Sequence, residues 1–385
     1  MIKSGEKFDL DKVSVIGCKS YDINQLDFII ERHFKELDPK GLLIKKGANV
    51  VIKPNLLLRR TPEEATTTHP EFIAAIIRAV KRRGGVPVIA ESPGGAYTKF
   101  NLHSVYSLCG IEEIARREGA QLNYDTGYHE VVSEDGKVCR SFNMIDPIAR
   151  ADIVISAAKL KTHAMMNYTG AVKNLFGVVP GLMKPEFHYR FPKKADFGNM
   201  LVDICERVKP AISFIDGIEG MEGNGPSGGS KRFVGLTLAG LNPHAVDLLA
   251  SRLIGFSPKE VPTVAAAIER SLCPGSIDGL EIVGERVERY LTDFAKPDSM
   301  GTDVLAKMPA FIRRPLVKSL TPKPFIVRST CIGCGKCIES CPQKTIRLVN
   351  KKAVINYSKC IRCYCCHEMC PEKSIAIKKS LMGRF

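Results

Sequence analysis

The residues whose spacing most clearly indicates a chemical role are cysteines that repeat near the end of the chain. The pattern Cys-x2-Cys-x2-Cys-x3-Cys-Pro begins at Cys331 and is repeated from Cys360. Thiolates separated by two residues wrap around one face of a [4Fe–4S] cluster, and the fourth thiolate of each run ligates the other cluster. The spacing therefore predicts two clusters. The first set of ligands is Cys331, Cys334, Cys337 and Cys370. The second set is Cys341, Cys360, Cys363 and Cys366.

This repeat resembles the bacterial two-cluster ferredoxins. A pair of zinc sites is the alternative, but zinc takes one tetrahedral set of four ligands and gives the Cys-Pro ending no role. Cys365 is a ninth cysteine in the repeat, and the spacing makes it a bystander. The run Cys363-Tyr-Cys365-Cys366 nevertheless leaves room for Cys365 to replace a neighbour as a ligand.

The cysteine-rich segment is also basic. Residues 325–385 hold 12 Lys and Arg against 3 Asp and Glu, whereas free bacterial ferredoxins are usually acidic. A basic surface suits an acidic redox partner such as a flavodoxin or another ferredoxin, or docking on the rest of the same chain. Compensation of the negative charge of the clusters explains it equally well.

The larger part of the chain alternates strand-like and helix-like segments. Short β-branched runs at 13–16, 49–52, 86–90, 152–155 and 211–215 are separated by helical patterns, among them 23–34, 70–83 and 111–117. Such alternation is typical of βαβ units. We expect an α/β large domain with a mainly parallel sheet, followed by a small α+β two-cluster ferredoxin-like domain.

Prolines mark the boundary between the two parts. Residues 295–324 contain five of them, and we interpret this stretch as a tether with one short helix near 304–308. The expected domains are therefore 1–294 and 325–385.

Polar residues follow several predicted strands of the large domain, where ligands of open α/β sheets bind. One strand end carries Lys53 and Asn55, a second carries Glu91, and a third carries Lys159, Lys161 and His163. Lys173, Asn174 and His188 follow the third strand in the sequence. The lysines would bind an anionic substrate, the histidines would move protons or ligate metal, and Glu91 would orient a histidine. The alternative is a solvated basic loop with structural histidines. We expect catalytic roles for His163, Lys173, His188 and Lys161, and cofactor binding by Lys53, Asn55, Lys159 and Asn174.

Four stretches give the large domain a family resemblance. They are Val51-Ile-Lys-Pro-Asn55, Lys159-Leu-Lys-Thr-His163, Thr169-Gly-Ala-Val-Lys-Asn-Leu-Phe-Gly177 and Gly225-Pro226. They resemble the domain of unknown function family 362, over roughly residues 45–255. That family is sometimes fused to two-cluster ferredoxin modules, and the resemblance implies no particular activity.

A second resemblance is to the lactate racemase family. His163, the segment Thr169 to Lys173, Pro180-Gly181 and His188 are similar to a segment of that family. The resemblance implies that Lys173 anchors a nickel-pincer nucleotide, His188 ligates nickel and His163 is the acid/base. Ala171 and Val172 depart from the family's Gly-Gly-x-Lys pattern, which favours a related fold over the same cofactor.

Composition narrows the classes of protein. The chain has 385 residues, a formal charge of +15 and no Trp, and no base-stacking pattern is interleaved with its basic residues. We therefore expect no nucleic-acid partner. No apolar run approaches the length of a membrane span, and the polar start lacks the apolar core of a signal peptide. We expect a cytoplasmic protein without a membrane span.

Some residues are predicted to have no role in the chemistry. Cys18, Cys109, Cys139, Cys205 and Cys273 show no ligand spacing and are expected to be buried. Asp216 and Asp247 are expected at the surface, and pairing with a lysine of the site is the alternative. The glycine-rich loop 223–228 lacks a following helix, so we expect a lid or an ordinary loop in place of a nucleotide site.

Together these patterns predict an iron–sulfur oxidoreductase. Single electrons from two [4Fe–4S] clusters would reduce a small anionic substrate, or a further unidentified cofactor, in the α/β domain. Two alternatives remain open. One is a racemase or isomerase with a nickel-pincer-like cofactor, and the other is an electron carrier whose large domain only docks a partner.

Overall fold

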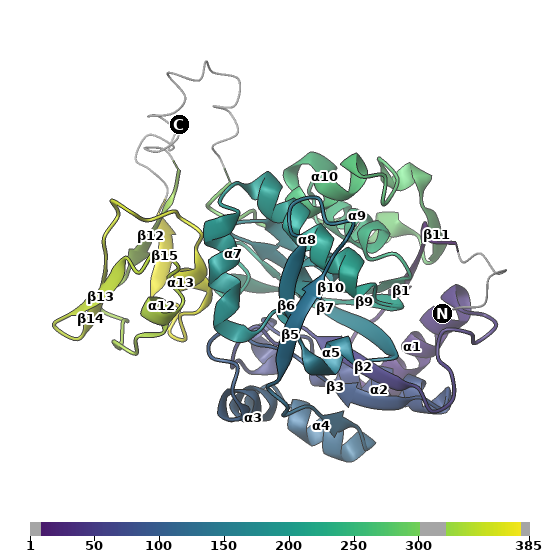
Figure 1. Cartoon of the computed structure of the whole chain (residues 1–385). Coiled ribbons are helices and arrows are strands. Elements are labelled where there is room, and N and C mark those ends of the chain that lie inside the picture. The colour runs from purple at the N-terminus through teal and green to yellow at the C-terminus, as the bar shows by residue number, and fades with distance from the viewer. Residues whose placement is uncertain (1–8, 301–320, 379–385) are drawn as a thin grey trace.

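The computed structural model describes residues 9–300 and 321–378. The helix expected near 304–308 lies outside these residues, as does the start of the chain. Figure 1 shows a large α/β body and a smaller module at its side, formed by the C-terminal part of the chain. No helix of the described ranges is long and apolar enough to cross a membrane.

One mixed sheet of nine strands organises the large domain. Five of its eight strand pairings are parallel, which confirms the predicted mainly parallel sheet. The strand order is β11-β1-β10-β9-β7-β2-β3-β4, with β8 paired to β7. In that order the strands are β11 (Glu281–Gly284), β1 (Lys12–Gly17), β10 (Ser230–Gly240), β9 (Ile212–Glu222), β7 (Ile153–His163), β2 (Asn49–Pro54), β3 (Val86–Ile89), β4 (Gln121–Leu122) and β8 (Asn167–Thr169).

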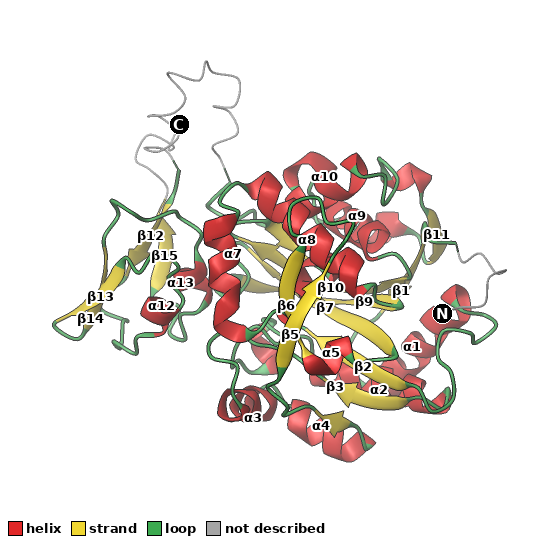
Figure 2. Cartoon of the chain, in the orientation of Figure 1, coloured by secondary structure: helices red, strands yellow, loops and turns green. Residues whose placement is uncertain are grey.

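Helices cover both faces of this sheet (Figure 2). One face packs against α1 (Ile23–Leu37), α2 (Pro70–Arg82), α3 (Lys99–Leu108) and α4 (Ile111–Glu118). The other packs against α8 (Lys194–Val208), α9 (Pro243–Leu253) and α10 (Pro262–Glu269). Val50 and Ile52 point to the first face and Val51 to the second, so both faces of β2 are buried, as the continuous apolar run predicts.

Shorter elements complete the large domain. A hairpin is formed by β5 (Tyr128–Val132) and β6 (Ser141–Ile145), and three short helices are α5 (Asp146–Ala149), α6 (Ala171–Asn174) and α7 (Lys184–Arg190). Single 3-10 turns span Pro62–Glu64, Leu175–Val178, Gly181–Met183, Pro258–Glu260, Ile277–Gly279 and Val287–Tyr290.

The C-terminal module has two small antiparallel pairs and two one-turn helices. Strand β12 (Lys323–Ile326) pairs with β15 (Ile375–Lys378), and β13 (Ile346–Val349) pairs with β14 (Lys352–Ile355). The helices are α12 (Lys336–Glu339) and α13 (Cys365–Glu368). Each helix begins inside one cysteine run, and the residues before them, Gly335 and Tyr364, have positive φ angles of 80° and 64°. Glycine adopts this conformation at no steric cost, whereas Tyr364 adopts it under strain.

Candidate functional site

A pocket lies where the carboxyl ends of β2, β3 and β7 meet the C-terminal module. It holds about 780 Å³ of empty space, including the open space at its mouth. The large domain contributes Asn55, Leu56, Leu57, Glu91, Ser92, Lys161, Lys173, Asn174, Phe176, Leu182, Lys184 and His188. The module contributes Ser340, Cys365, Glu368 and Met369. Three strand ends therefore converge as the sequence suggests, but a separate domain supplies the opposite wall.

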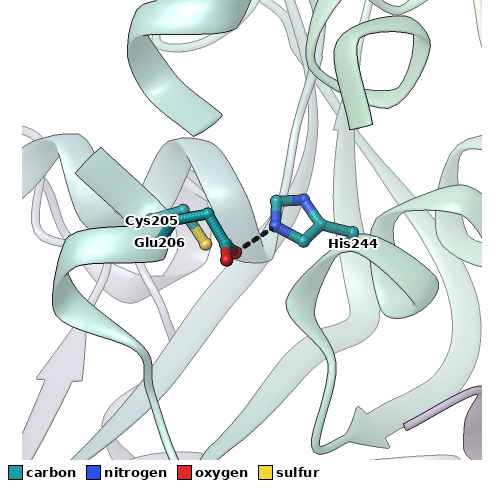
Figure 3. Close-up of side chains that lie close together, drawn as sticks. All are labelled: Cys205, Glu206 and His244. Atoms are coloured by element: carbon teal, nitrogen blue, oxygen red, sulfur yellow. Dashed lines mark hydrogen bonds and ion pairs between the residues drawn. The ribbon is translucent and has the colours of Figure 1, made fainter. Parts of the chain in front are cut away.

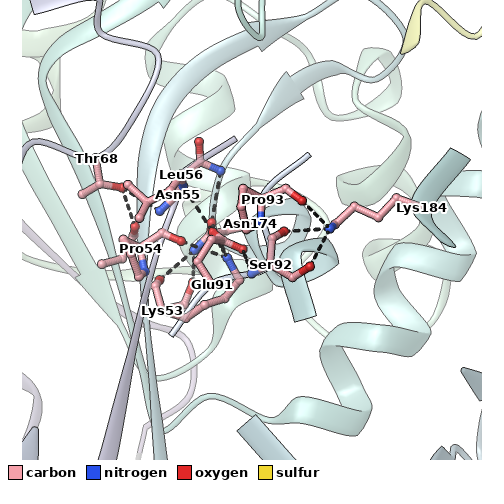
Figure 4. Close-up of polar contacts among 12 residues, drawn as sticks. Lys53, Pro54, Asn55, Leu56, Thr68, Glu91, Ser92, Pro93, Asn174 and Lys184 are labelled. Atoms are coloured by element: carbon pink, nitrogen blue, oxygen red, sulfur yellow. Dashed lines mark hydrogen bonds and ion pairs between the residues drawn. The ribbon is translucent and has the colours of Figure 1, made fainter. Parts of the chain in front are cut away.

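Lys53 is buried behind this pocket in a network of its own (Figure 4). Its ammonium lies 2.6 Å from Glu91 Oε2 and also donates to the carbonyl oxygen of Pro54 and to Asn174 Oδ1. Burial lowers the pKa of Lys53, and the Glu91 carboxylate opposes this shift. Glu91 thus neutralises a lysine, whereas the sequence suggested that it would orient a histidine.

Lys159 has a carboxylate partner as well. Its ammonium is 2.9 Å from Asp216 Oδ2 and 2.8 Å from the Tyr21 hydroxyl. Asp216 is fully buried on β9, directly opposite Lys159 in the parallel register, so the expected surface placement of this aspartate is wrong. Lys159 does not line the pocket. Lys53 and Lys159 therefore act first as halves of buried ion pairs.

Lys161 faces the pocket and has only neutral partners. Its ammonium donates to Asn55 Oδ1 and to the carbonyl oxygen of Thr66, both at 2.6 Å. Burial, together with the positive charges of Lys173 and Lys159, lowers the pKa of Lys161 well below its usual value. Asn55 Nδ2 also donates to Asn174 Oδ1, so the two asparagines connect Lys161 to Lys53.

Lys173 reaches the pocket from α6. Among the described residues its ammonium has no hydrogen bond, and it lies 5.8 Å from the centre of the Phe176 ring. Burial lowers the pKa of Lys173. The turn that carries it is held by Asp247, whose carboxylate accepts from the amides of Ala171 and Val172 and from the Tyr168 hydroxyl. Asp247 is buried, so its expected surface placement is also wrong.

Helix α7 adds two further residues to the pocket. Lys184 donates to the carbonyl oxygens of Ser92 and Pro93 and to Ser92 Oγ, and burial lowers its pKa to about 7. His188 stacks on Phe197 with ring centres 4.4 Å apart, and burial lowers its pKa to about 3. His188 is therefore neutral at physiological pH. The sequence analysis missed Lys184, because the only local signal is its place at the start of a short helix.

His163 lies at the end of β7 and contacts the module instead of lining the pocket. Its Nδ1 accepts from the amides of Met165 and Met166, which leaves the proton on Nε2. Nε2 is 3.1 Å from Glu368 Oε1. Burial, with Lys173 and His188 nearby, lowers the pKa of His163 well below its usual value. The neutral ring lies close to Glu368, yet His163 Nε2 and Glu368 Oε1 both lack a hydrogen-bond partner among the described residues. The sequence analysis did not select Glu368.

Several contacts seat α13 on the large domain. Ser227 Oγ donates to the carbonyl oxygen of Glu368, and His367 Nε2 lies 2.9 Å from the carbonyl oxygen of Asn224. Arg60 donates to the carbonyl oxygen of Cys370, and Lys373 pairs with Glu64 at 3.0 Å. The glycine-rich loop therefore serves as a seat for the module, in place of the lid or ordinary loop expected.

The cysteines of the two sets surround two separate hollows of the module. One hollow, of about 350 Å³, is lined by Cys331, Cys334, Cys337 and Cys370. The other, of about 310 Å³, is lined by Cys341, Cys360, Cys363 and Cys366. Four thiols around each hollow are the donor set that a [4Fe–4S] cluster requires. Cys365 lines neither hollow and faces the pocket.

A further group of side chains lies away from the pocket. Figure 3 shows Cys205 and Glu206 of α8 beside His244 of α9, with their ligand atoms within 4.8 Å of one another. His244 Nε2 is 2.8 Å from Glu206 Oε1, which ties the two helices together. Burial raises the pKa of the Cys205 thiol well above its usual value and disfavours the thiolate that a metal requires. We interpret the group as a packing contact. The other isolated cysteines are buried too, as predicted.

Comparison with known proteins agrees with this division of the chain. A family model described as "Domain of unknown function (DUF362)" matches residues 50–252, and a "4Fe-4S dicluster domain" model matches residues 323–371. The thylakoid-associated protein sll1697 of Synechocystis sp. is 31% identical over 319 residues, which are 82% of this chain and 95% of that protein.

A solved structure is also similar in part. It is the lactate racemase apoprotein from Thermoanaerobacterium thermosaccharolyticum, with 14% identity and a TM-score of 0.33. The match covers 52% of this chain and about half, 49%, of that one, and a likeness this weak says nothing about activity. The family model spans the motifs at Lys53, Lys161 and Lys173, and the chain belongs to the DUF362 family, with a 4Fe-4S dicluster domain at its C-terminal side.

Proposed function

We propose that this iron–sulfur protein is an oxidoreductase that reduces a small anion in the pocket between its two domains. Two [4Fe–4S] clusters would be held by the first and second cysteine sets, and each would carry one electron at a time. The substrate accepts two electrons in two single steps, together with two protons from water. Thiolate ligands need a reducing compartment, so the proposal includes the cytoplasm as the location.

One observation carries this proposal: the cysteine module is itself a wall of the cationic pocket. Ser340 and Cys365 line the pocket, and each directly precedes a cysteine of the second set in the sequence. Met369 has the same relation to Cys370 of the first set. The module residues that line the pocket are therefore sequence neighbours of the cluster ligands, which suits electron transfer within one chain.

The charges of the pocket favour an anion. Lys161, Lys173 and Lys184 have no carboxylate within ion-pair distance among the described residues, whereas Lys53 and Lys159 have one each. A buried charge is costly without a partner. Lys173 is the ammonium best placed to bind an incoming carboxylate or phosphate, because no atom of the described residues accepts its protons. Burial lowers the pKa of Lys161, which Asn55 fixes in place, and a bound anion would favour its charged form.

The remaining lining limits the substrate further. Leu56, Leu57, Phe176, Leu182 and Met369 give the pocket an apolar side. We therefore expect a substrate with one anionic group and an apolar, reducible body, such as an unsaturated or 2-oxo carboxylate. Neutral His188 can donate a hydrogen bond to it. His163 would hold Glu368 in place, and Asn174 would hold Lys53 and Asn55.

The test begins with anaerobically purified protein. Iron and sulfide analysis should give about eight of each per chain, the content of two such clusters. Clusters reduced with dithionite are then mixed with a panel of unsaturated and 2-oxo carboxylates, and their reoxidation is followed by visible absorption and EPR. We expect one compound class to speed cluster reoxidation in the parent protein. Lys173→Gln should abolish this acceleration. Lys45→Gln, which changes an exposed lysine, should retain it.

The other outcomes separate the alternatives. Nickel or a nucleotide that is retained only when Lys173 is present would replace this proposal with a racemase or isomerase. Reoxidation that responds to no anion and is unchanged in Lys173→Gln would favour an electron carrier with a docking domain. Four or fewer iron atoms per chain would contradict the assignment of two clusters.

A further inference from the structure

The two cysteine sets differ in how they meet the rest of the molecule. Among the described residues, both hollows are lined by the module alone, but the first set holds the one exposed cysteine of the two sets, Cys334. Cysteines of the second set border a space shared with the large domain, where Cys360 and Cys363 face Met165 and His188. The first set thus reaches the surface at Cys334 and touches the large domain through Cys370, whereas the second set borders the shared space at Cys360 and Cys363.

An exposed apolar residue with basic neighbours lies beside the first cysteine set. Ile332 is 62% exposed, one of the most exposed large apolar side chains described, and it precedes Cys334 by two residues. Lys336 and Lys351 are exposed nearby, and Lys352 donates to the carbonyl oxygen of Cys331. The carbonyl oxygen of Lys351 lies only 2.3 Å from where a Cβ on Gly333 would stand, so this lysine borders the same loop. We call Ile332, Cys334, Lys336, Lys351 and Lys352 the outer face.

Acidic residues near the outer face are few. Glu339 lies 3.2 Å from Lys336, in an exposed pair that contributes little, and Glu372 is a lining residue of the first hollow. The outer face therefore keeps a net positive charge around one exposed apolar side chain. Such a surface steers and then holds a negatively charged protein.

We propose that the outer face docks an acidic one-electron carrier protein, from which electrons pass through the first cysteine set to the second and on to the pocket. This inference rests on the proposed function and adds the partner and the direction of flow. Each docking oxidises one carrier by one electron, so two dockings supply the two electrons that one substrate molecule takes up. The pocket side offers no such route to a protein, because α13 and loop 223–228 are in contact there.

The test uses the whole cluster-loaded chain and a flavodoxin as the acidic carrier. The double reversal Lys336→Glu with Lys351→Glu is compared with Lys19→Glu plus Lys45→Glu, which changes two exposed lysines of the large domain and gives the same net charge. Two quantities are measured: the dissociation constant of oxidised flavodoxin, and the rate constant for cluster reduction by reduced flavodoxin. Photochemical reduction with a neutral deazaflavin reports whether the clusters are intact.

We expect the outer-face reversal to weaken binding and slow reduction by about tenfold or more, and to remove most of the salt dependence of both. The control pair should change each by less than twofold. Equal losses in both pairs, or no loss in the first, would overturn the docking surface. If the reversal damages the clusters, the neutral pair Lys336→Gln with Lys351→Gln decides by the same criteria.

This result is independent of the substrate. Reoxidation of clusters already reduced, by an anion bound in the pocket, does not involve the outer face. An outer face that fails the test while anion-driven reoxidation persists would refute the docking inference and leave the proposed function standing.

Discussion

Lysines at the carboxyl edge of the sheet fall into two groups that differ in what balances their charge. Lys53 and Lys159 are paired with the buried carboxylates Glu91 and Asp216. Lys161 and Lys184 are bonded to neutral oxygens, and Lys173 has no hydrogen bond among the described residues. The first group is internally neutral and supports the fold. The second keeps positive charge facing a pocket, and the difference shows that a lysine's partner, more than its position, decides its role.

The largest expected effect comes from breaking a pair of the first group. Glu91→Gln leaves the Lys53 ammonium buried without a counter-ion, which should lower the free energy of unfolding by roughly 3–5 kcal/mol. Urea denaturation followed by circular dichroism measures this loss. Adding Lys53→Met should recover much of the stability, since the orphaned charge is then gone. A single variant as stable as the parent would contradict the pairing.

The matching change in the second group should have the opposite pattern. Lys173→Gln removes a charge that has no ion pair among the described residues and is favoured only by the nearby Glu368 and Cys365. The free energy of unfolding should therefore stay the same or rise. Affinity for a carboxylate that fits the pocket should fall by roughly 10- to 100-fold, the value of one hydrogen bond between charged groups. Calorimetric titration of the parent and the variant with the carboxylate measures the two affinities. A large loss of stability with unchanged affinity would place Lys173 in the first group.

The module's contribution to the pocket can be weakened at one glycine. A Cβ on Gly228 would lie 2.5 Å from Cε1 of His367, the residue by which α13 contacts Asn224. Gly228→Ala should weaken this seat by about 1–3 kcal/mol, as overpacking does. Hydrogen exchange of the α13 amides should become faster. Gly275→Ala, with no atom within 4 Å of the added carbon, is the control and should change nothing.

The smallest effect expected is a pH dependence from Lys184. Burial lowers its pKa to about 7, so the ammonium loses its charge as the pH rises through neutrality. Affinity for a carboxylate, whose own charge is constant there, should fall by up to about tenfold between pH 6 and pH 8. Lys184→Gln should flatten this profile. A profile that persists in the variant would assign the titration to another group.

Much of the fold follows from local patterns. Runs such as 49–52 and 211–215 are strands because their residues are apolar on both faces, and the expected helices 23–34, 70–83 and 111–117 appear within a few residues of their predicted limits. The antiparallel pairing of β9 with β10 did not follow, because two adjacent apolar strands carry no signal of their relative direction. The role of the loop between them did not follow either, because its contacts are with another domain.

The site was predictable only in part. The strand ends bearing Lys53, Lys161 and His163 identify the edge of the sheet, since ligands gather there in α/β folds. The pairing of Lys159 with Asp216 depends on the register of two strands nearly sixty residues apart. Cys365 and Glu368 enter the pocket through the docking of one domain on another, which no local spacing encodes.

The four residues of helix α13 contribute both to a cysteine set and to the pocket wall. Cys366 belongs to the second cysteine set, while Cys365 and Glu368 are part of the pocket wall. Small metal-binding modules commonly fold only around their metal. The pocket would then form only after the clusters are inserted. A chain that lacks iron would have an incomplete pocket and would bind no substrate. Through this one helical turn, the amount of working protein in a cell would follow its iron supply.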